Sequence, residues 1–117
     1  MNTENSSFWY KLDKLVADCS LQIDRPKGTS HPRYKSFIYP YDYGYLEGSL
    51  SGDGEGIDVW VKDFSNKTVT GLICTVDLER RDTEIKILLG FTPEISQEIL
   101  KIHNNGFQSA ILLLRPS

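Results

Sequence analysis

The feature that most constrains the fold of this chain is the alternation of apolar and polar residues along several short segments. The pattern runs through residues 19–24, 57–62, 67–79 and 82–89, and a largely apolar segment follows at 107–114. Successive side chains of a β-strand point to opposite faces, so a period of two indicates half-buried strands. Residues 36–39 fit one more short strand. The sequence therefore predicts five or six strands.

Two other segments carry the signals of helices. Apolar residues recur at helical spacing from Phe8 to Val16, and Ser6 or Ser7 is suited to cap the start of this helix. A second helix is expected after the Thr-Pro-Glu sequence at 92–94, which supplies a cap, a first-turn proline and an acid near the positive end of the helix dipole. Together these elements predict a mainly β (α+β) fold, a small closed or partly open antiparallel barrel with two flanking helices.

Length and composition narrow the class of protein. A chain of 117 residues with 39% hydrophobic and 25% charged residues fits one soluble domain spanning 1–117. A net charge of −3 disfavours nucleic acid as a partner. No apolar run has the length of a membrane span, and the first residues lack the basic and apolar regions of a signal peptide. We therefore expect a cytoplasmic protein without a membrane partner.

The cysteines and histidines do not indicate a metal site. Cys19 and Cys74 are far apart and have no metal-ligand spacing, so they are expected to be reduced, buried thiols, and a disulfide is the less favoured reading. His31 and His103 likewise have no ligand spacing with each other or with a cysteine, and we expect both at the surface.

The alternation also assigns several large side chains to the interior. Ile85, Ile87 and Leu89 share one strand face and are expected to point inward. Trp9 and Trp60 are interpreted as packing residues.

An acidic turn is the first candidate functional element. Asp53, Glu55 and Asp58 place three carboxylates within six residues, on a glycine-rich turn that leads into an apolar strand. Carboxylates gathered in this way need a counter-charge, and oxygen ligands suit a hard divalent cation such as Mg²⁺. Lys27 and Arg33, which precede the turn, suggest that a phosphate group is the other partner of the metal. A solvated turn remains the alternative, because Asp and Gly are good turn formers.

A second charged group is expected further along the chain. If 67–79 and 82–89 pair as a hairpin, their charged residues gather near one end of the sheet, namely Glu79, Asp82, Glu84 and Lys86. The alternative is an ordinary solvent face with cross-strand ion pairs to Arg80 or Arg81.

Alternating tyrosines precede the acidic turn, at positions 39, 41, 43 and 45. An aromatic stripe on a small barrel can bind single-stranded nucleic acid. Pro40 and Gly44 interrupt the stripe, however, and the chain is acidic, so we favour one or two tyrosines facing a site while the others pack.

The order of these motifs resembles that of the family I soluble inorganic pyrophosphatases. The motifs are Asp24-Arg25-Pro26-Lys27-Gly28, Arg33-Tyr34, Tyr39-Pro40-x-x-Tyr43-Gly44-Tyr45 and Asp53-Gly54-Glu55-Gly56-Ile57-Asp58-Val59. Members of that family carry an acidic-Pro-Lys-Gly segment, Lys-Tyr-Glu, Tyr-Pro-x-x-Tyr-Gly and Asp-Gly-Asp-Pro-x-Asp in the same order. The resemblance is close over residues 23–61 and loose over 79–86.

The resemblance implies a fold, a chemistry and a set of site residues. The fold would be an OB-like antiparallel β-barrel, and the activity would be Mg²⁺-dependent hydrolysis of pyrophosphate, with self-association to a homo-oligomer as a family tendency. Transferred by position, the metal ligands are Asp53, Glu55, Asp58, Glu79 and Glu84. The substrate-binding residues are Lys27, Arg33, Tyr39, Tyr43 and Lys86. Glu55, which orients or deprotonates the attacking water, and Tyr43 are the implied catalytic residues.

The chain also departs from the family pattern. Glu55 replaces the signature aspartate, Gly56 replaces a proline, and only residues 36–38 remain where the family has a hairpin with a phosphate-binding arginine. Arg80 stands at an acidic position, and the C-terminal Tyr-Lys pair is missing. Two functions therefore stay open. The first is hydrolysis of a phosphoanhydride, with pyrophosphate or a nucleotide as the small phosphate-containing ligand. The second is a catalytically degenerate module that binds metal, phosphate or a protein partner.

Overall fold

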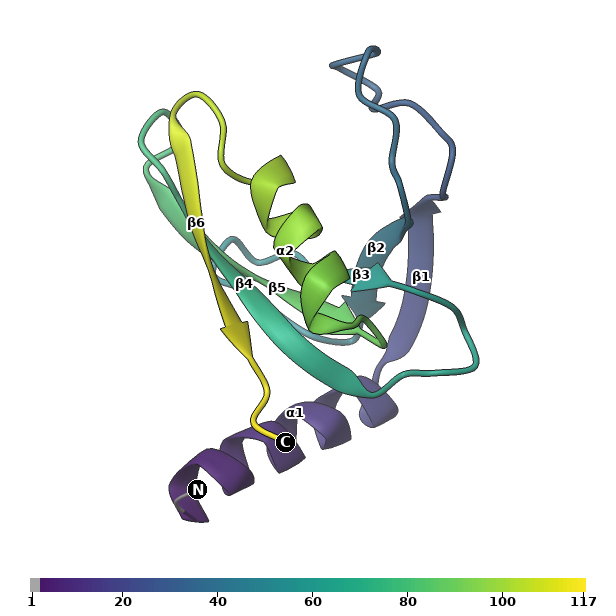
Figure 1. Cartoon of the computed structure of the whole chain (residues 1–117), viewed down its shortest axis with the longest axis vertical. Helices are drawn as coiled ribbons and strands as arrows, with labels where there is room; N and C mark the ends of the chain where they lie inside the picture. Colours follow the sequence, from purple (N-terminus) through teal and green to yellow (C-terminus); the bar gives the residue numbers. More distant parts are fainter. Residues whose placement is uncertain (1–2) are drawn as a thin grey trace.

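The computed structural model describes residues 3–117, with side chains from residue 6 onward. Its elements are α1 (Thr3–Asp18), β1 (Ser20–Arg25), β2 (Asp42–Glu47), β3 (Ile57–Val61), β4 (Val69–Asp77), β5 (Asp82–Leu89), α2 (Pro93–Ile102) and β6 (Gln108–Leu114). The six strands form one sheet in the order β1-β2-β3-β5-β4-β6 (Figure 1). Met1 and Asn2, part of the segment without signal-peptide features, lie outside the described residues.

The sheet is mixed and open. Its neighbouring strands are antiparallel except for β3 and β5, which run parallel. Within residues 3–117, β1 and β6 form its two edges and do not pair with each other. The predicted α+β class with two helices is confirmed, but the predicted antiparallel barrel is wrong. Closure is not needed to bury the apolar surface here, because each face of the sheet has its own hydrophobic core.

The two helices pack on opposite faces of this sheet. On one face Trp9 of α1 packs with a core that includes Val59 and Ile87. On the other face Ile99 of α2 packs with a core that includes Trp60. Both tryptophans are buried, as the sequence predicted. No helix within the described residues is both long enough and apolar enough to cross a lipid bilayer.

Five strands coincide with predicted segments, four of them alternating and one largely apolar, and the sixth was missed. The sequence pattern does not predict β2, because Pro40 and Gly44 interrupt the alternating tyrosines. Gly44 is part of this strand and faces Ile23 of β1. Residues 36–39, which were predicted as a strand, instead lie in the loop between β1 and β2 and contribute only an isolated bridge from Ile38 to Ser30.

The helix ends follow local capping, with one correction. The first helix begins at Thr3, so Ser6 and Ser7 lie inside it and not at its cap. The second helix begins as predicted, since the Thr92 hydroxyl accepts a hydrogen bond from the Ile95 N–H (3.3 Å). It ends at Ile102, a few residues before the Asn-Gly pair that was expected to stop it.

The α1 face is only partly covered. Ile87 and Leu89 are fully buried, as the alternation predicted, but Ile85 on the same face is 48% exposed. The reason is that α1 lies across one end of the sheet, which Figure 1 shows. Between α1 and the strands β4, β5 and β6 a groove of about 730 Å³ remains, lined by Phe8 and Leu12 from the helix. Cys74, which also lines it, is a free, half-buried thiol, as is Cys19.

An ion pair ties α1 to the segment that follows the edge strand β6. The Arg115 guanidinium, just after β6, donates to both carboxylate oxygens of Asp13, each at 2.9 Å. The same guanidinium donates to the Val69 carbonyl (3.0 Å), so it joins α1, β4 and the C-terminal segment. A bidentate arginine–carboxylate pair is among the stronger polar contacts of proteins.

The close approach of β1 and β2 gives a first prediction. A Cβ on Gly44 would lie 1.8 Å from the Gln22 carbonyl oxygen, which is backbone and cannot rotate away. We expect Gly44→Ala to lower the free energy of unfolding by about 3 kcal/mol or more. Gly52→Ala is the matched control, because no atom lies within 4 Å of its added Cβ. Urea unfolding of both variants measures the difference, and equal stability of the two would contradict the β1–β2 register.

Candidate functional site

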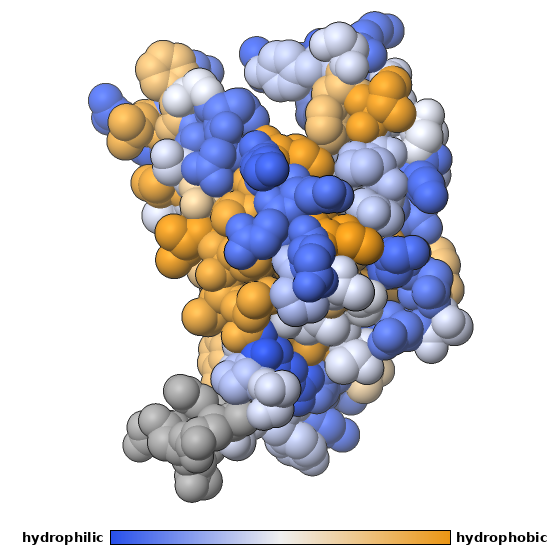
Figure 2. Space-filling model, in the orientation of Figure 1, coloured by the Kyte–Doolittle hydropathy of each residue, from blue (hydrophilic) through white to orange (hydrophobic). Residues whose placement is uncertain are grey.

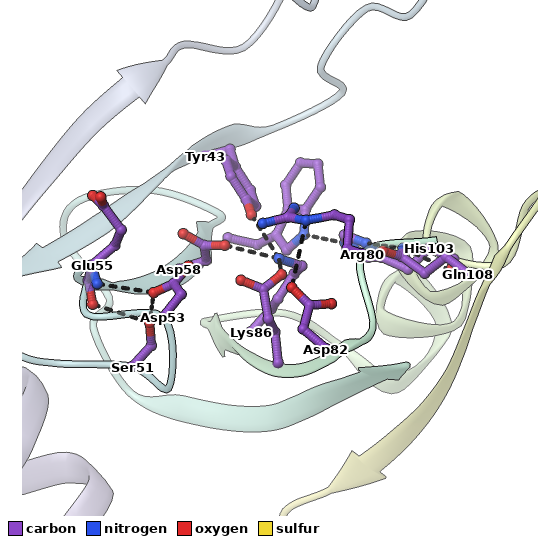
Figure 3. Close-up of polar contacts among 12 residues, drawn as sticks. Tyr43, Ser51, Asp53, Glu55, Asp58, Arg80, Asp82, Lys86, His103 and Gln108 are labelled. Atoms are coloured by element: carbon purple, nitrogen blue, oxygen red, sulfur yellow. Dashed lines mark hydrogen bonds and ion pairs between the residues drawn. The ribbon is translucent and has the colours of Figure 1, made fainter. Parts of the chain in front are cut away.

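A buried lysine organises the polar residues on the α2 face. Lys86 is only 5% exposed, yet it is surrounded by oxygen atoms. Its ammonium nitrogen lies 2.8 Å from Asp58 Oδ2, 3.1 Å from the Tyr43 hydroxyl and 3.4 Å from Glu84 Oε1 (Figure 3). We call these four residues the Lys86 cluster. All four were predicted to be site residues, and the fold brings them together.

Strand register explains why these residues meet. Asp58 of β3 is the direct partner of Lys86 in the parallel β3–β5 pair. Glu84 precedes Lys86 by two residues in β5 and so points to the same face. Tyr43 of β2 pairs with Trp60, and its ring packs edge-on against the indole at 4.8 Å between centroids. A slip of one residue in β5 would move Lys86 to the opposite face.

The tyrosines of the site are held in the phenol form. Burial raises the pKa of Tyr43 well above 10, and the neighbouring Asp58 carboxylate raises it further. Burial also raises the pKa of Tyr39, although the Arg25 guanidinium beside its hydroxyl acts in the opposite direction. Tyr39 adjoins the cluster, with its ring centroid 5.6 Å from that of Tyr43. Both hydroxyls therefore keep a proton that they can donate to a ligand oxygen.

The acidic turn lies apart from the Lys86 cluster. The Asp53 carboxylate accepts hydrogen bonds from the Ser51 hydroxyl and from the Glu55 N–H (2.9 Å), which lower the pKa of Asp53. Its carboxylate thus stabilises the turn itself. The Glu55 side chain is exposed and projects along the turn and not toward Lys86 (Figure 3).

The predicted metal ligands are therefore divided between several places. Asp58 and Glu84 share one point in space, whereas Glu79 is exposed in the β4–β5 turn, where its N–H binds Asp77 Oδ1 (2.9 Å). Within the residues that the structure describes, no three side chains of His, Cys, Asp or Glu gather closely enough to hold a metal ion. Asp58 and Glu84 offer two carboxylates to one cation, and the Lys86 ammonium occupies that position.

Two predicted phosphate-binding cations lie in the β1–β2 loop (residues 26–41). The Lys27 ammonium is 5.8 Å from the Tyr41 ring centroid, and the Lys27 N–H donates to Asp42 Oδ1 (2.8 Å). The Arg33 guanidinium lies 5.7 Å from the centroid of the Tyr34 ring. Neither residue is among the partners of Lys86.

The structure adds two arginines that the sequence analysis did not assign to the site. The Arg25 guanidinium, at the end of β1, lies near Tyr39, and its charge counteracts part of the rise that burial causes in the pKa of Tyr39. Arg80 pairs with Asp82 (3.5 Å between Nε and Oδ2). Arg80 lies in the β4–β5 turn, two residues before Asp82, so this ion pair is local and is not one of the cross-strand pairs expected on the hairpin. Arg25 belongs to the Asp24-Arg25-Pro26-Lys27-Gly28 motif, so its position in the sequence could have indicated that it lies near the site.

His103 was predicted at the surface and is buried, with 8% exposure. It caps the end of α2, where its ring turns inward and its Nε2 accepts a hydrogen bond from Trp60 Nε1 (3.0 Å). Burial, followed by the Lys86 charge, lowers the pKa of His103 to about 4. The imidazole is therefore neutral at physiological pH. Spacing along the sequence gave no signal for this residue, because it belongs to a helix cap and not to a periodic face.

The comparison with known proteins agrees with part of this picture. No protein-family model matches the chain. Over 57 residues, which are 49% of this chain, it is 39% identical to an inorganic pyrophosphatase of Aeropyrum pernix. The matched segment is 28% of that protein, so the chain spans about a quarter of the length of its relative. The partial match indicates a distant relation to inorganic pyrophosphatase.

The burial of His103 gives a prediction about acid stability. In the unfolded chain His103 has the ordinary histidine pKa of about 6.5, whereas in the folded chain its pKa is about 4. The stabilising contribution is therefore complete above pH 6.5 and is lost as the pH falls toward 4, by up to about 3 kcal/mol. Urea unfolding at pH 7 and pH 4.5 measures this loss.

Two variants isolate the contribution of His103 from that of the carboxylates. His103→Gln keeps an acceptor for Trp60 and should reduce the difference in unfolding free energy between the two pH values. His31→Gln removes the other histidine of the chain and should leave that difference in place. An unchanged difference in His103→Gln would contradict the buried neutral imidazole.

Proposed function

We propose that this chain hydrolyses phosphoanhydrides with Mg²⁺, and that inorganic pyrophosphate is the first substrate to test. The observation that carries the proposal is the convergence of Asp58 and Glu84 on the Lys86 ammonium at 2.8 and 3.4 Å, with the Tyr43 hydroxyl beside them. Two carboxylates, a cation and a protonated phenol are the groups needed to hold a metal and a phosphate side by side. The partial match to an inorganic pyrophosphatase supports the same chemistry.

The donor set fits Mg²⁺. This ion prefers oxygen ligands, keeps several waters, and is usually bound by one or two carboxylates together with substrate phosphates. Asp58 and Glu84 provide such a pair, and both are partly shielded from solvent. Mg²⁺ bound there would neutralise negative charge on the phosphate and would lower the pKa of a bound water. Asp53 would join only by giving up its hydrogen bonds within the turn.

The side chains of the cluster have distinct roles in this proposal. Lys86 is shared by two carboxylates, and its ammonium becomes available to a phosphoryl oxygen once their charge is compensated in another way. The Tyr43 hydroxyl stays protonated because burial raises its pKa, and it donates to the same phosphoryl group. Arg80 adds a second positive charge at the exposed side. Such preorganised donors stabilise charge that develops in the transition state.

Glu55 remains the proposed acceptor for the proton of the attacking water. Its carboxylate is exposed on the turn that precedes β3 and does not face Lys86. The role therefore requires the turn to bring Glu55 toward Asp58 when substrate binds. A general base must come within hydrogen-bond reach of the water, although such contacts often form only in the substrate complex.

The second candidate function is binding without hydrolysis, as in a catalytically degenerate module. It is favoured by the state of the acidic turn, where the Asp53 carboxylate is taken up by Ser51 and by the Glu55 N–H. In that case the Lys86 cluster would bind metal and phosphate, or the module would serve a protein partner, and no bond would be cleaved.

Asp58 provides the test of the metal site. We expect Asp58→Asn to lower Mg²⁺-dependent phosphate release from pyrophosphate by about 100-fold, because one of two metal-binding carboxylates is lost. Asp63→Asn is the matched control, since Asp63 is an exposed turn carboxylate that contacts Ser65. Phosphate release is measured colorimetrically while Mg²⁺ is titrated. Equal rates in Asp58→Asn and in the unsubstituted chain would refute the proposed site.

Glu55→Asp separates the two candidate functions. Hydrolysis with Glu55 as base predicts that the rate of phosphate release changes, and it rises if the extra methylene of glutamate is a handicap. A non-hydrolytic module predicts no turnover by either chain, while Mg²⁺ with phosphate raises the melting temperature in an Asp58-dependent manner. No turnover and no shift in melting temperature would refute both candidates.

A further inference from the structure

The β1–β2 loop differs in composition from the rest of the chain. Residues 26–41 contain four aromatic residues, His31, and three cations at positions 27, 33 and 35, but no carboxylate, although the whole chain has a net charge of −3. Figure 1 shows that this loop rises beyond the ends of β1 and β2. Figure 2 shows a notch between the loop and the opposite upper end of the molecule, where the turn from β4 to β5 lies. A basic, aromatic element thus borders an open space.

Hydrogen bonds within the loop order its backbone. The Gly28 N–H donates to the Tyr39 carbonyl (2.9 Å), and the Tyr39 N–H donates to the Thr29 carbonyl (3.0 Å). Further out, the His31 N–H donates to the Phe37 carbonyl (2.9 Å). The loop is therefore a small irregular hairpin, and its rings are positioned before any ligand arrives. Such preorganisation lowers the entropic cost of binding.

The rings form a continuous series from the tip of the loop to the Lys86 cluster. The Tyr34 and His31 rings lie 5.1 Å apart, and the His31 ring stacks on Tyr39 with an interplanar angle of 12°. Tyr39 in turn lies 5.6 Å from Tyr43, whose hydroxyl contacts Lys86. His31 is fixed in orientation, because its Nδ1 accepts hydrogen bonds from the backbone N–H groups of residues 33 and 34.

Exposure distinguishes the inner rings of this series from the outer ring. Tyr39 is 6% exposed and belongs to the core, whereas Tyr34 is 60% exposed and adjoins the Arg33 guanidinium. An exposed ring with a neighbouring cation is the arrangement on which nucleobases stack, and the interaction accepts any base. Inorganic pyrophosphate has no group that could use it. A nucleoside polyphosphate has a base at one end and phosphates at the other.

We propose that the β1–β2 loop is a base-stacking platform, and that the preferred phosphoanhydride of this chain is a nucleoside polyphosphate. The base stacks on Tyr34 beside His31 and Arg33, and the phosphates extend toward Lys86. The placement of the phosphates depends on the proposed function of the Lys86 cluster. The placement of the base depends only on the structure of the loop.

The test compares ADP with pyrophosphate, both with Mg²⁺, by isothermal titration calorimetry on the full chain. Tyr34→Ala should weaken ADP binding by about 5- to 150-fold, the equivalent of 1–3 kcal/mol per stacked base, and leave pyrophosphate binding unchanged. Tyr34→Phe keeps the ring and should retain ADP affinity. Tyr10→Ala is the matched control, because Tyr10 is 61% exposed on α1 and far from the loop in sequence.

The outcomes separate this inference from the proposed function. Equal loss of both ligands in Tyr34→Ala, or no preference of the unsubstituted chain for ADP, would overturn the platform and leave hydrolysis standing. An ADP-selective loss in Tyr34→Ala that is accompanied by no effect of Asp58→Asn on either ligand would support the platform and count against the Lys86 site. Tighter binding of single-stranded oligouridylate than of ADP would overturn the inference in favour of nucleic acid.

Discussion

The structure depends on how one buried ammonium group is compensated. An unpaired charge inside a protein costs several kcal/mol, so Lys86 can lie at 5% exposure only if carboxylates meet it there. The parallel register of β3 and β5 meets this condition, since it places Asp58 directly beside Lys86. A one-residue shift would bury Asp58 among the valines and leucines of the α1 face and leave the ammonium without its partner. The charge pair therefore specifies the register that also creates the site.

The α2 face adds a second restraint on the same region. Trp60 packs against Tyr43 and donates a hydrogen bond from its indole N–H to His103. Trp60 therefore links the end of α2 to Tyr43 of the Lys86 cluster. The next residue, Asn104, exchanges hydrogen bonds with the backbone of Ala110 in the edge strand β6. That strand contains no charged residue, and exposed strand edges are commonly protected by charges or prolines. Here a side chain from the helix end covers part of the edge.

Much of the fold could be predicted from alternation, and the errors have identifiable causes. The alternation predicted four strands because their polar and apolar faces differ, and the largely apolar segment at 107–114 indicated β6. The alternation missed β2, whose Gly44 is required for the close approach of β1 and not for a turn. Closure into a barrel was wrong because alternation states which residues share a face, and does not state whether a helix or another part of the sheet covers it. His103 was misplaced for a related reason, since a helix cap has no periodicity.

The candidate site was predictable where residues lie on paired strands and not where they lie on loops. Asp58, Glu84 and Lys86 are fixed by strand register, which a sequence pattern can anticipate. Asp53 and Glu55 follow the hydrogen bonds of their own turn, and Arg33 follows the loop that carries it. Proximity in sequence to Asp58 therefore did not place the acidic turn in the cluster.

The charges of the cluster imply an order of events in the proposed function. Lys86 with two ionised carboxylates carries a net negative charge, which repels a phosphate anion approaching alone. A divalent cation held by the carboxylates reverses that sign. Affinity for phosphate should therefore depend on the metal, and by thermodynamic linkage affinity for the metal should depend equally on phosphate. The basic β1–β2 loop is separate from this balance, because its cations do not pair with Asp58 or Glu84, and it can attract a polyphosphate whether or not metal is bound.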